Sequence, residues 1–221
     1  MEISSNQRLP AILRSIIVVF VLLIMLVVGL LVKSIFFSEK VETPRTATER
    51  SLMDAQAVVK ADPKNAQARL EVGRVLAEMG QYEEASQQLK IAKQLDPKER
   101  EIPYTLAMVY KANGNAEAAI KELNAAIALH EAQFTTKFAD AYFELGLIYY
   151  DQENYKKALG AFENAEKGSP QAADMLLYLG LTYEKLGKKD KAVAVLEYVV
   201  KLLPDNKEAK EALVRLGTKP K

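Results

Sequence analysis

The chain has 221 residues, with 30 Lys and Arg against 29 Asp and Glu, so its formal net charge is +1. A nucleic-acid-binding domain usually carries a basic patch or stripe, and no long basic run occurs in this sequence. The chain contains no cysteine, which excludes disulfides, thiolate metal sites and cysteine nucleophiles. The length allows one domain of about 160 residues together with a shorter N-terminal segment.

The first predicted element is an apolar segment near the N-terminus. Residues 16–32 are Ile, Val, Leu, Phe, Met and a single Gly, and the run lies between Arg14 and Lys33. At about 1.5 Å per residue the run spans roughly 27 Å, against about 30 Å for a bilayer core. Because Lys33 can extend to the interface, we expect residues 15–37 to be a retained transmembrane anchor in the lipid bilayer, after a short tail of residues 1–14.

The apolar run could instead be a cleavable signal peptide or a buried soluble helix. A cleavable signal peptide has an apolar stretch of about 7–15 residues and a small-x-small cleavage site. The run here is longer, and Lys, Ser, Ile and Phe follow it, which is a poor cleavage site. A buried soluble helix would need a core on every side, and nothing downstream offers one. Both alternatives fit less well than an anchor.

A polar segment of mixed charge, residues 38–50, follows the apolar run and has no apolar period. We expect it to be a tether, with a mean end-to-end distance of about 20 Å if it is fully flexible. Residues 51–65 are expected to form a single leading helix, because Ala55, Val58 and Pro63 have the spacing of the second half of the repeat described next.

The remainder of the chain repeats a pattern with a period of 34 residues. The four units are 66–99, 100–133, 139–172 and 173–206. Their eighth positions are Gly73, Ala107, Gly146 and Gly180, and their twentieth positions are Ala85, Ala119, Ala158 and Ala192. Their twenty-fourth positions are Leu89, Leu123, Phe162 and Leu196, and their thirty-second positions are Pro97, Glu131, Pro170 and Pro204.

This order of small, small, large and proline indicates a pair of closely packed helices. Small residues at positions 8 and 20 let the two helices touch, and we expect the large residue at position 24 to fill the gap to the next unit. Proline ends the second helix because it lacks an N–H group. The second unit has Glu131 instead, and five extra residues lie within 128–138. We interpret them as a longer second helix in that unit.

The spacing resembles that of the tetratricopeptide repeat (TPR) family. The resemblance implies an all-α fold: an α-solenoid of four stacked helix–turn–helix units, 66–206, behind the leading half-repeat and preceded by one transmembrane helix. Residues 207–221 then form a C-terminal capping helix and tail, because Ala209, Ala212 and Leu213 are apolar on one face only. The anchor makes the chain similar to membrane-anchored bacterial TPR proteins.

A search for catalytic groups finds none. The single histidine, His130, lies near the end of a predicted helix, where the helix dipole favours it, and no second histidine could share a metal. The carboxylates follow polar helix faces, as Glu83 and Glu84 do. We therefore expect no enzyme activity, no cofactor and no metal site.

The resemblance also implies a concave groove lined by the first helix of each unit, without the Lys, Asn and Arg clamp that some relatives use for carboxylates. The candidate groove residues are Leu70, Arg74, Tyr104, Met108, Phe143, Leu147, Tyr150, Leu177 and Leu181. The candidate rim residues are Asp140, Asp151, Asp174 and Glu184. Most groove positions are apolar or aromatic, which suits either a bound partner or packing against the adjacent unit.

The sequence therefore predicts a non-catalytic, membrane-tethered module that binds another polypeptide in its groove, as an assembly or chaperone-like accessory of a membrane or envelope complex. A structural subunit that self-associates or scaffolds a larger complex is the alternative. The expected location is the bacterial cytoplasmic membrane. Arg8 and Arg14 precede the anchor, and Lys33, Lys40 and Arg45 follow it. These charges do not settle the orientation, and we lean towards repeats on the extracytoplasmic side.

Overall fold

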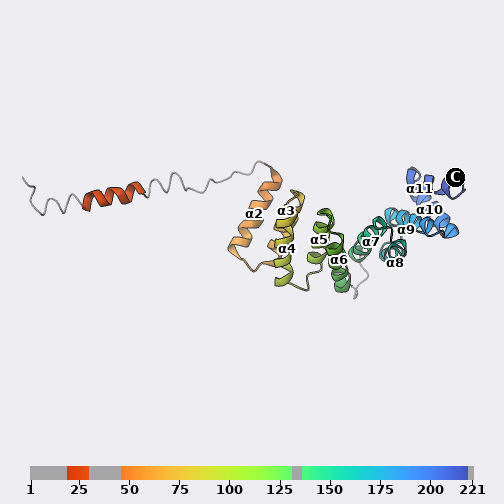
Figure 1. The fold of residues 1–221 in the computed structure, drawn as a ribbon, viewed down its shortest axis with the longest axis horizontal. Helices are drawn as coiled ribbons and strands as arrows, with labels where there is room; N and C mark the ends of the chain where they lie inside the picture. The colour runs from red at the N-terminus through yellow and green to blue at the C-terminus, as the bar shows by residue number, and fades with distance from the viewer. Residues whose placement is uncertain (1–18, 30–45, 131–135, 219–221) are drawn as a thin grey trace, which may run out of the picture. The chain divides into compact units, whose positions relative to one another are not determined.

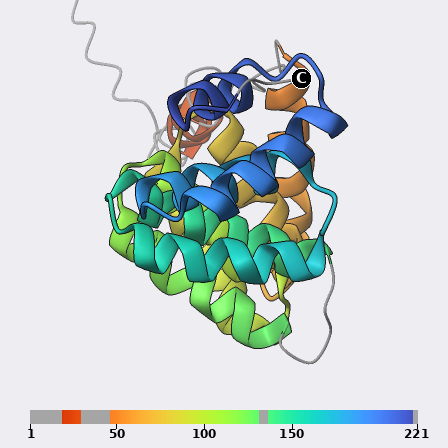
Figure 2. The ribbon, with the colours of Figure 1, turned by 90° about the vertical axis from the view of Figure 1, so that its right-hand side faces the viewer.

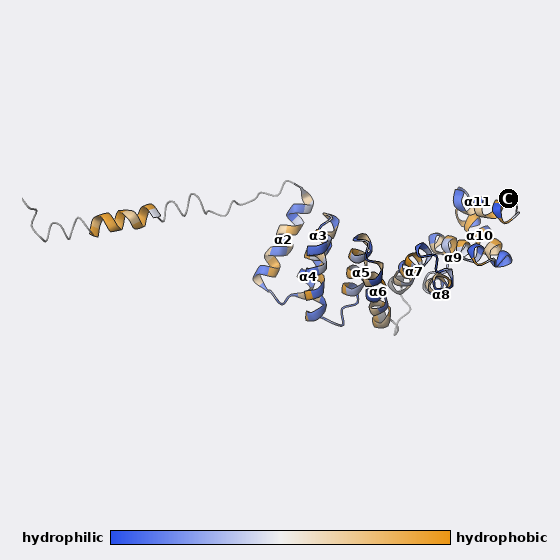
Figure 3. Cartoon of the chain, viewed as in Figure 1, coloured by the Kyte–Doolittle hydropathy of each residue, from blue (hydrophilic) through white to orange (hydrophobic). Residues whose placement is uncertain are grey.

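The computed structural model describes residues 19–29, 46–130 and 136–218, with the backbone alone for residue 130 and residues 136–138. The chain divides into two compact units, residues 1–44 and 45–221. In the first unit, residues 19–29 form a helix whose side chains are exposed and apolar (Figure 3). Residues 15–18 and 30–37 of the predicted anchor lie outside the described residues. Among the residues that are described, no helix combines the length and apolar character needed to cross a bilayer.

The second unit is all-α over its described residues, as the repeat pattern predicts (Figure 1). Its helices are α2 (Ala47–Ala61), α3 (Ala66–Glu78), α4 (Tyr82–Leu95), α5 (Glu101–Ala112), α6 (Ala116–His130), α7 (Thr136–Asp151), α8 (Tyr155–Gly168), α9 (Ala173–Lys185), α10 (Lys189–Leu202) and α11 (Lys207–Arg215). Each helix packs on the next one in the chain. Seen from the end of the stack, successive helix pairs lie one behind another (Figure 2).

Helix α2 begins earlier than the sequence pattern predicts. Thr46 caps it: the Thr46 side chain accepts a hydrogen bond from the backbone N–H of Glu49, and the Glu49 carboxylate accepts one from the backbone N–H of Thr46. This reciprocal capping satisfies two donors at the helix start. Residues 47–50, which we expected to belong to the tether, are therefore the first turn of α2.

Within each unit, the large side chain at position 24 packs onto the small residue at position 8. A methyl group placed on Gly73 would lie 2.6 Å from Cγ of Leu89, and one placed on Gly146 would overlap the ring of Phe162. Both large side chains are fully buried. Position 24 thus fills the space between the two helices of its own unit. In the third unit it also contacts the next unit, as expected, because the Phe162 and Tyr178 ring centroids lie 6.0 Å apart.

The turn between the two helices of each unit has a residue with positive φ at position 15. Three of these residues are glycines, Gly80, Gly114 and Gly187, with φ between 68° and 75°. In the third unit the residue is Glu153, with φ 58°. Glycine adopts this conformation without steric cost, whereas a side chain at the same φ costs about 1–2 kcal/mol. The backbone of the third turn is therefore locally strained at Glu153.

The insertion between the second and third units is shared between two helices in the described residues. Helix α6 ends at His130, one residue longer than the 14-residue helices α4 and α8. Helix α7 begins at Thr136, three residues before the expected start of its unit. The predicted longer second helix thus accounts for little of the insertion. Residues 131–135 lie outside the described part of the chain.

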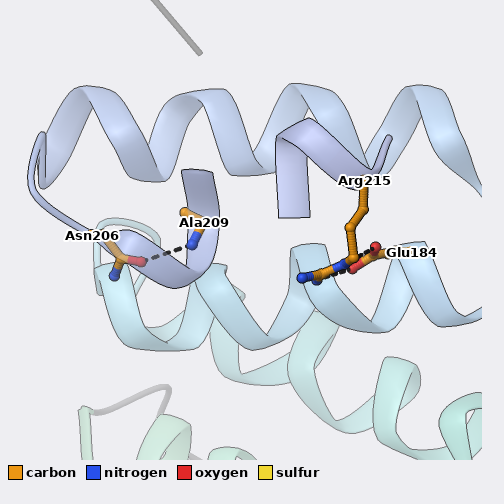
Figure 4. Close-up of polar contacts among 4 residues, drawn as sticks. All are labelled: Glu184, Asn206, Ala209 and Arg215. Carbon is orange, nitrogen blue, oxygen red and sulfur yellow. Dashed lines mark hydrogen bonds and ion pairs between the residues drawn. The ribbon is translucent and has the colours of Figure 1, made fainter. Parts of the chain in front are cut away.

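Helix α11 covers the end of the stack. Asn206 caps it by accepting a hydrogen bond from the backbone N–H of Ala209 (Figure 4). Ala209, Ala212 and Leu213 are buried against α9 and α10, while Val214 is 62% exposed. This one-sided burial confirms the capping helix that the sequence predicts.

Candidate partner-binding surface

The first helices of the units, α3, α5, α7 and α9, together with α11, form one surface, which we call the inner surface. Contacts between these helices skip a helix in the chain: α3 touches α5, α7 touches α9 and α9 touches α11. In Figure 1 these first helices lie on one side of the row and α4, α6 and α8 lie on the other. The two helix sets therefore present separate surfaces.

Ion pairs join neighbouring inner helices at three places. Arg74 of α3 lies 3.7 Å from Glu101 of α5 and 3.6 Å from Glu71 on its own helix. Lys111 of α5 and Glu144 of α7 are 2.5 Å apart. At the third place, Arg215 of α11 donates two hydrogen bonds of 2.8 Å to Glu184 of α9 (Figure 4). These pairs engage Arg74, Lys111 and Arg215.

Three of the predicted groove residues belong to the core instead. Leu70 has no exposed surface and packs in a cluster with Ile102 of α5. Leu177 and Leu181 are 6% and 3% exposed and lie in the cluster that contains Leu213 of α11. The next inner helix thus covers position 5 in the first unit and positions 5 and 9 in the fourth. The alternative reading, packing against the adjacent unit, is the correct one for all three leucines.

The other predicted groove residues keep exposed surface. Arg74 is exposed, and the remaining five residues are half-buried. Tyr104 and Met108 pack against the cluster formed by α5, α6 and α7. Phe143, Leu147 and Tyr150 pack against the cluster at α8, α9 and α10. The predicted stripe thus borders two separate core clusters.

A cluster of aromatic rings lies where α7 meets α9, and Tyr178 is at its centre. The Tyr178 ring centroid is 5.8 Å from that of Phe143, 5.7 Å from that of Tyr150 and 6.0 Å from that of Phe162. Tyr150 also contacts Tyr155 at 5.3 Å. We call these five residues the aromatic cluster. Edge-to-face pairs of this kind contribute about 0.5–1.5 kcal/mol beyond their buried area.

Sequence reasoning missed Tyr178 because it occupies position 6 of its unit, which lies outside the expected groove positions. The same position in the third unit is Glu144 and in the first unit is Glu71, and both make ion pairs on the inner surface. A polar or aromatic residue at position 6 in all four units, Glu71, Thr105, Glu144 and Tyr178, was the available signal. Position 6 therefore belongs to the inner surface in this chain.

The predicted acidic rim is partly engaged within the structure. Glu184 is held by Arg215, whose hydrogen bonds keep the pKa of the Glu184 carboxyl below its ordinary value, so it is not a free rim group. Asp151 and Asp174 are exposed and Asp140 is half-buried. A further carboxylate, Glu208 of α11, lies near the aromatic cluster and was not predicted.

The inner tyrosines lie in apolar and negatively charged surroundings. Burial, followed by the charges of Glu144 and Asp140, raises the pKa of Tyr104 to about 12. Burial, then Tyr155, Glu208 and Glu184, raises the pKa of Tyr150 to about 12 as well. The phenols of Tyr104 and Tyr150 are therefore neutral hydrogen-bond donors at physiological pH. Among the described residues, no group of His, Asp and Glu is arranged to hold a metal ion.

Family models match most of this helical unit. One model, described as tetratricopeptide repeat, matches residues 49–100, and another of the same description matches residues 104–171 and 143–207. The chain belongs to the tetratricopeptide repeat family. The TPR models end at residue 207, where the α11 cap begins.

Curated relatives match the TPR region over a small share of their length. The chain is 30% identical over 142 residues to the human protein O-mannosyl-transferase TMTC1, which covers 62% of the chain and 16% of that protein. It is 33% identical over 119 residues to the probable UDP-N-acetylglucosamine–peptide N-acetylglucosaminyltransferase SPINDLY of Hordeum vulgare, covering 51% of the chain and 12% of that protein. The chain thus spans less than a fifth of either relative.

Solved TPR structures share the fold over most of their own length. A crystal structure of the MamA protein has a TM-score of 0.62 at 28% identity, with 76% of this chain and 85% of that chain covered. The crystal structure of YrrB, described as a TPR protein with an unusual peptide-binding site, has a TM-score of 0.62 at 24% identity, with 75% and 82% covered. The second likeness shows the fold alone.

Proposed function

We propose that the protein is a non-catalytic, membrane-tethered TPR module that binds a segment of another polypeptide on its inner surface, as an assembly or chaperone-like accessory of a membrane or envelope complex. The observation that carries the proposal is the half-exposed aromatic cluster centred on Tyr178. Aromatic side chains with polar tips are the groups that most often anchor protein interfaces. The peptide-binding site described for YrrB supports the same use of a similar fold.

The stack itself explains why the binding groups lie on the inner surface. Positions 8, 20, 24 and 27 are consumed by packing between the two helices of each unit, and their side chains are buried in every unit. The inner residues Tyr104, Met108, Phe143 and Tyr150 are only half-buried, so part of each side chain stays open to a partner. A partner laid across α5, α7 and α9 can contact Tyr104 and Met108 of α5, Phe143 and Tyr150 of α7, and Tyr178 of α9.

A double substitution on the inner surface tests the binding role. Phe143→Ala with Tyr104→Ala removes two half-buried rings, and we expect it to reduce recovery of the native partner from membranes at least about tenfold, as loss of interface anchors does. The matched control is Ile91→Ala with Tyr198→Ala, which removes two exposed apolar side chains from the outer helices α4 and α10. Both variants are first checked for an unchanged helical signal. Full partner recovery by a folded inner variant would refute the inner surface as the site.

The mass of the purified chain distinguishes client binding from the alternative role. A stable monomer in nonionic detergent agrees with a module that binds a client. A defined oligomer that the inner substitutions dissociate would instead identify a structural subunit that self-associates.

The tether is proposed from the apolar run at residues 16–32 and the exposed apolar helix at 19–29. We propose that this segment holds the protein in the bacterial cytoplasmic membrane, with the repeats on the extracytoplasmic side. The full chain should resist alkaline extraction and keep an N-terminus upstream of Ile16. The variant Leu22→Glu with Leu26→Glu should become extractable, because each charge at the centre of a span costs about 2.5–3.5 kcal/mol. A soluble product that begins after Val32 would exclude a retained anchor.

A further inference from the structure

We propose that the inner surface of α7, α9 and α11 recognises a polypeptide segment that presents arginine or lysine side chains, with the cation placed against the Tyr150 and Tyr178 rings and beside the neighbouring carboxylates. This inference rests on the proposed function and specifies the chemistry of the partner. The proposal is based on two features that lie close together on this surface. One is a pair of half-exposed tyrosine rings, and the other is a set of carboxylates that form no ion pair with any described residue.

Three carboxylates from three neighbouring helices lie near the Tyr150 and Tyr178 rings. Asp151 directly follows Tyr150, and Asp174 precedes Tyr178 by one helical turn. Asp151 is the last residue of α7, and Asp174 and Glu208 lie in the first turns of α9 and α11. All three are exposed. Burial raises the pKa of Tyr178, and the charges of Glu208, Asp151 and Asp174 raise it further, while Lys111 opposes them. The three negative charges therefore all act on the phenol of Tyr178.

Two cations of this part of the surface are already engaged in ion pairs. Lys111 pairs with Glu144 at 2.5 Å, and Arg215 donates both of its hydrogen bonds to Glu184. The ammonium of Lys185 lies 6.0 Å from the Tyr155 ring centroid. Within the described residues, no Lys or Arg forms an ion pair with the three convergent carboxylates, so this part of the surface has an excess of negative charge.

A guanidinium or ammonium group satisfies both features at once. The Tyr150 and Tyr178 rings meet nearly edge to face, at 86°, so ring faces and edges of both border the same place. Arg and Lys are attracted to aromatic faces by about 0.5–1 kcal/mol at exposed sites, and Arg also bonds a carboxylate in a planar fork. Acidic peptides, nucleic acids and anionic lipid headgroups would instead be repelled.

The inner charges are tested with three capped, fluorescein-labelled peptides. The first repeats Leu-Arg-Ala three times, the second replaces each Arg with citrulline, and the third replaces each Arg with Glu. Citrulline keeps the length and planar end group of Arg but is neutral, because a carbonyl oxygen replaces one guanidinium nitrogen. Binding to the full chain in nonionic detergent is measured by fluorescence anisotropy at about 50 mM and about 500 mM salt, because screening shortens the reach of surface charges.

We expect the Arg peptide to bind at least about tenfold more tightly than the citrulline peptide at low salt, and the advantage to shrink at high salt, as rim electrostatics do. The inner variant Asp151→Asn, Asp174→Asn and Glu208→Gln should weaken binding of the Arg peptide by about tenfold or more. It should leave binding of the citrulline peptide unchanged.

The matched control changes the same net charge on the outer helices. The variant Glu117→Gln, Asp190→Asn and Glu197→Gln removes three exposed carboxylates from α6 and α10, two of them in first helical turns. It should change binding of the Arg peptide by less than about twofold, since these groups lie away from the inner surface. Equal weakening by both triple variants would mean that net charge alone attracts the peptide, and would overturn the proposal.

The remaining outcomes separate this inference from the proposed function. Equal binding of the Arg and citrulline peptides, both lost in Phe143→Ala with Tyr104→Ala, would overturn the cationic preference and leave the binding role standing. If no peptide binds at up to about 1 mM, which corresponds to a binding free energy of about 4 kcal/mol, the inference is overturned. Recovery of the partner from membranes would then still test the proposed function. A dimer that the inner triple variant dissociates would identify a second copy as the occupant, against the proposal.

Discussion

The inner surface differs between its two ends, although the helices beneath it are packed in the same way. At α3 and α5, Arg74 is balanced by Glu71 and Glu101, and Leu70 beneath them is fully buried. At α7, α9 and α11, half-exposed rings adjoin carboxylates for which the described part of the chain supplies no ion-pair partner. The repeat thus determines where the helices lie, while the residues between the packing positions determine which charges and rings each end of the inner surface exposes.

The largest effect should come from breaking the shared packing that both ends depend on. Gly146→Ala places a methyl group against the fully buried Phe162 ring, and we expect a loss of about 1–3 kcal/mol because the core is overpacked. Gly160→Ala is the matched control, since nothing lies within 4 Å of its added methyl group. It should gain up to about 1 kcal/mol from helix propensity. Urea unfolding of the two variants gives both values, and shifts of the same sign would refute the packing assignment.

A smaller effect should distinguish the third turn from the other three. Glu153→Gly relieves the positive φ at this turn, and we expect the free energy of unfolding to rise by about 1 kcal/mol. Gly187→Glu, the converse change at the same position of the fourth unit, should lower it by a similar amount. Thermal unfolding of both variants checks the pair. A Glu153→Gly variant no more stable than the unsubstituted chain would show that the turn carries no strain.

The smallest effect concerns the ion pair that joins α9 to the cap. The hydrogen bonds from Arg215 hold the pKa of Glu184 below its ordinary value of 4.5, so the pair stabilises the fold above that pH and stops doing so as the pH falls through the lowered pKa. Glu184→Gln should cost at most about 1 kcal/mol at pH near 7, since Arg215 is half exposed and screened. The difference from the unsubstituted chain should vanish near pH 2, by urea unfolding. Glu117→Gln, at an exposed position in the first turn of α6, serves as the control for the loss of one carboxylate.

The sequence was informative where a residue recurs at the same position of each unit. Gly73, Gly146 and Gly180 could be placed against the second helix because close packing leaves only one explanation for a small residue at that spacing. The same reasoning identified the cap, since α11 is apolar on one face. These features depend on local spacing, which a sequence displays directly.

The inner surface was harder to predict because it depends on how close the next inner helix lies. Leu177 and Tyr178 are adjacent in sequence, yet α11 buries Leu177 while Tyr178 turns towards α7. Glu208 joins the aromatic cluster from a helix of the cap, which lies outside the four repeats. Neither relation can be read from the composition of one repeat, because each depends on the rotation between neighbouring units.

Site-specific photo-crosslinking tests the central claim most directly. A benzoylphenylalanine replaces Tyr178 on the inner helix α9 in one variant, and Tyr198, an exposed tyrosine on the outer helix α10, in the other. Both full-length variants are illuminated in native membranes, and crosslinked products are resolved by mass. If a partner lies on the inner surface, we expect a crosslink to another polypeptide from position 178 and none from position 198. Crosslinking of equal strength at both positions, or from position 198 alone, would contradict it.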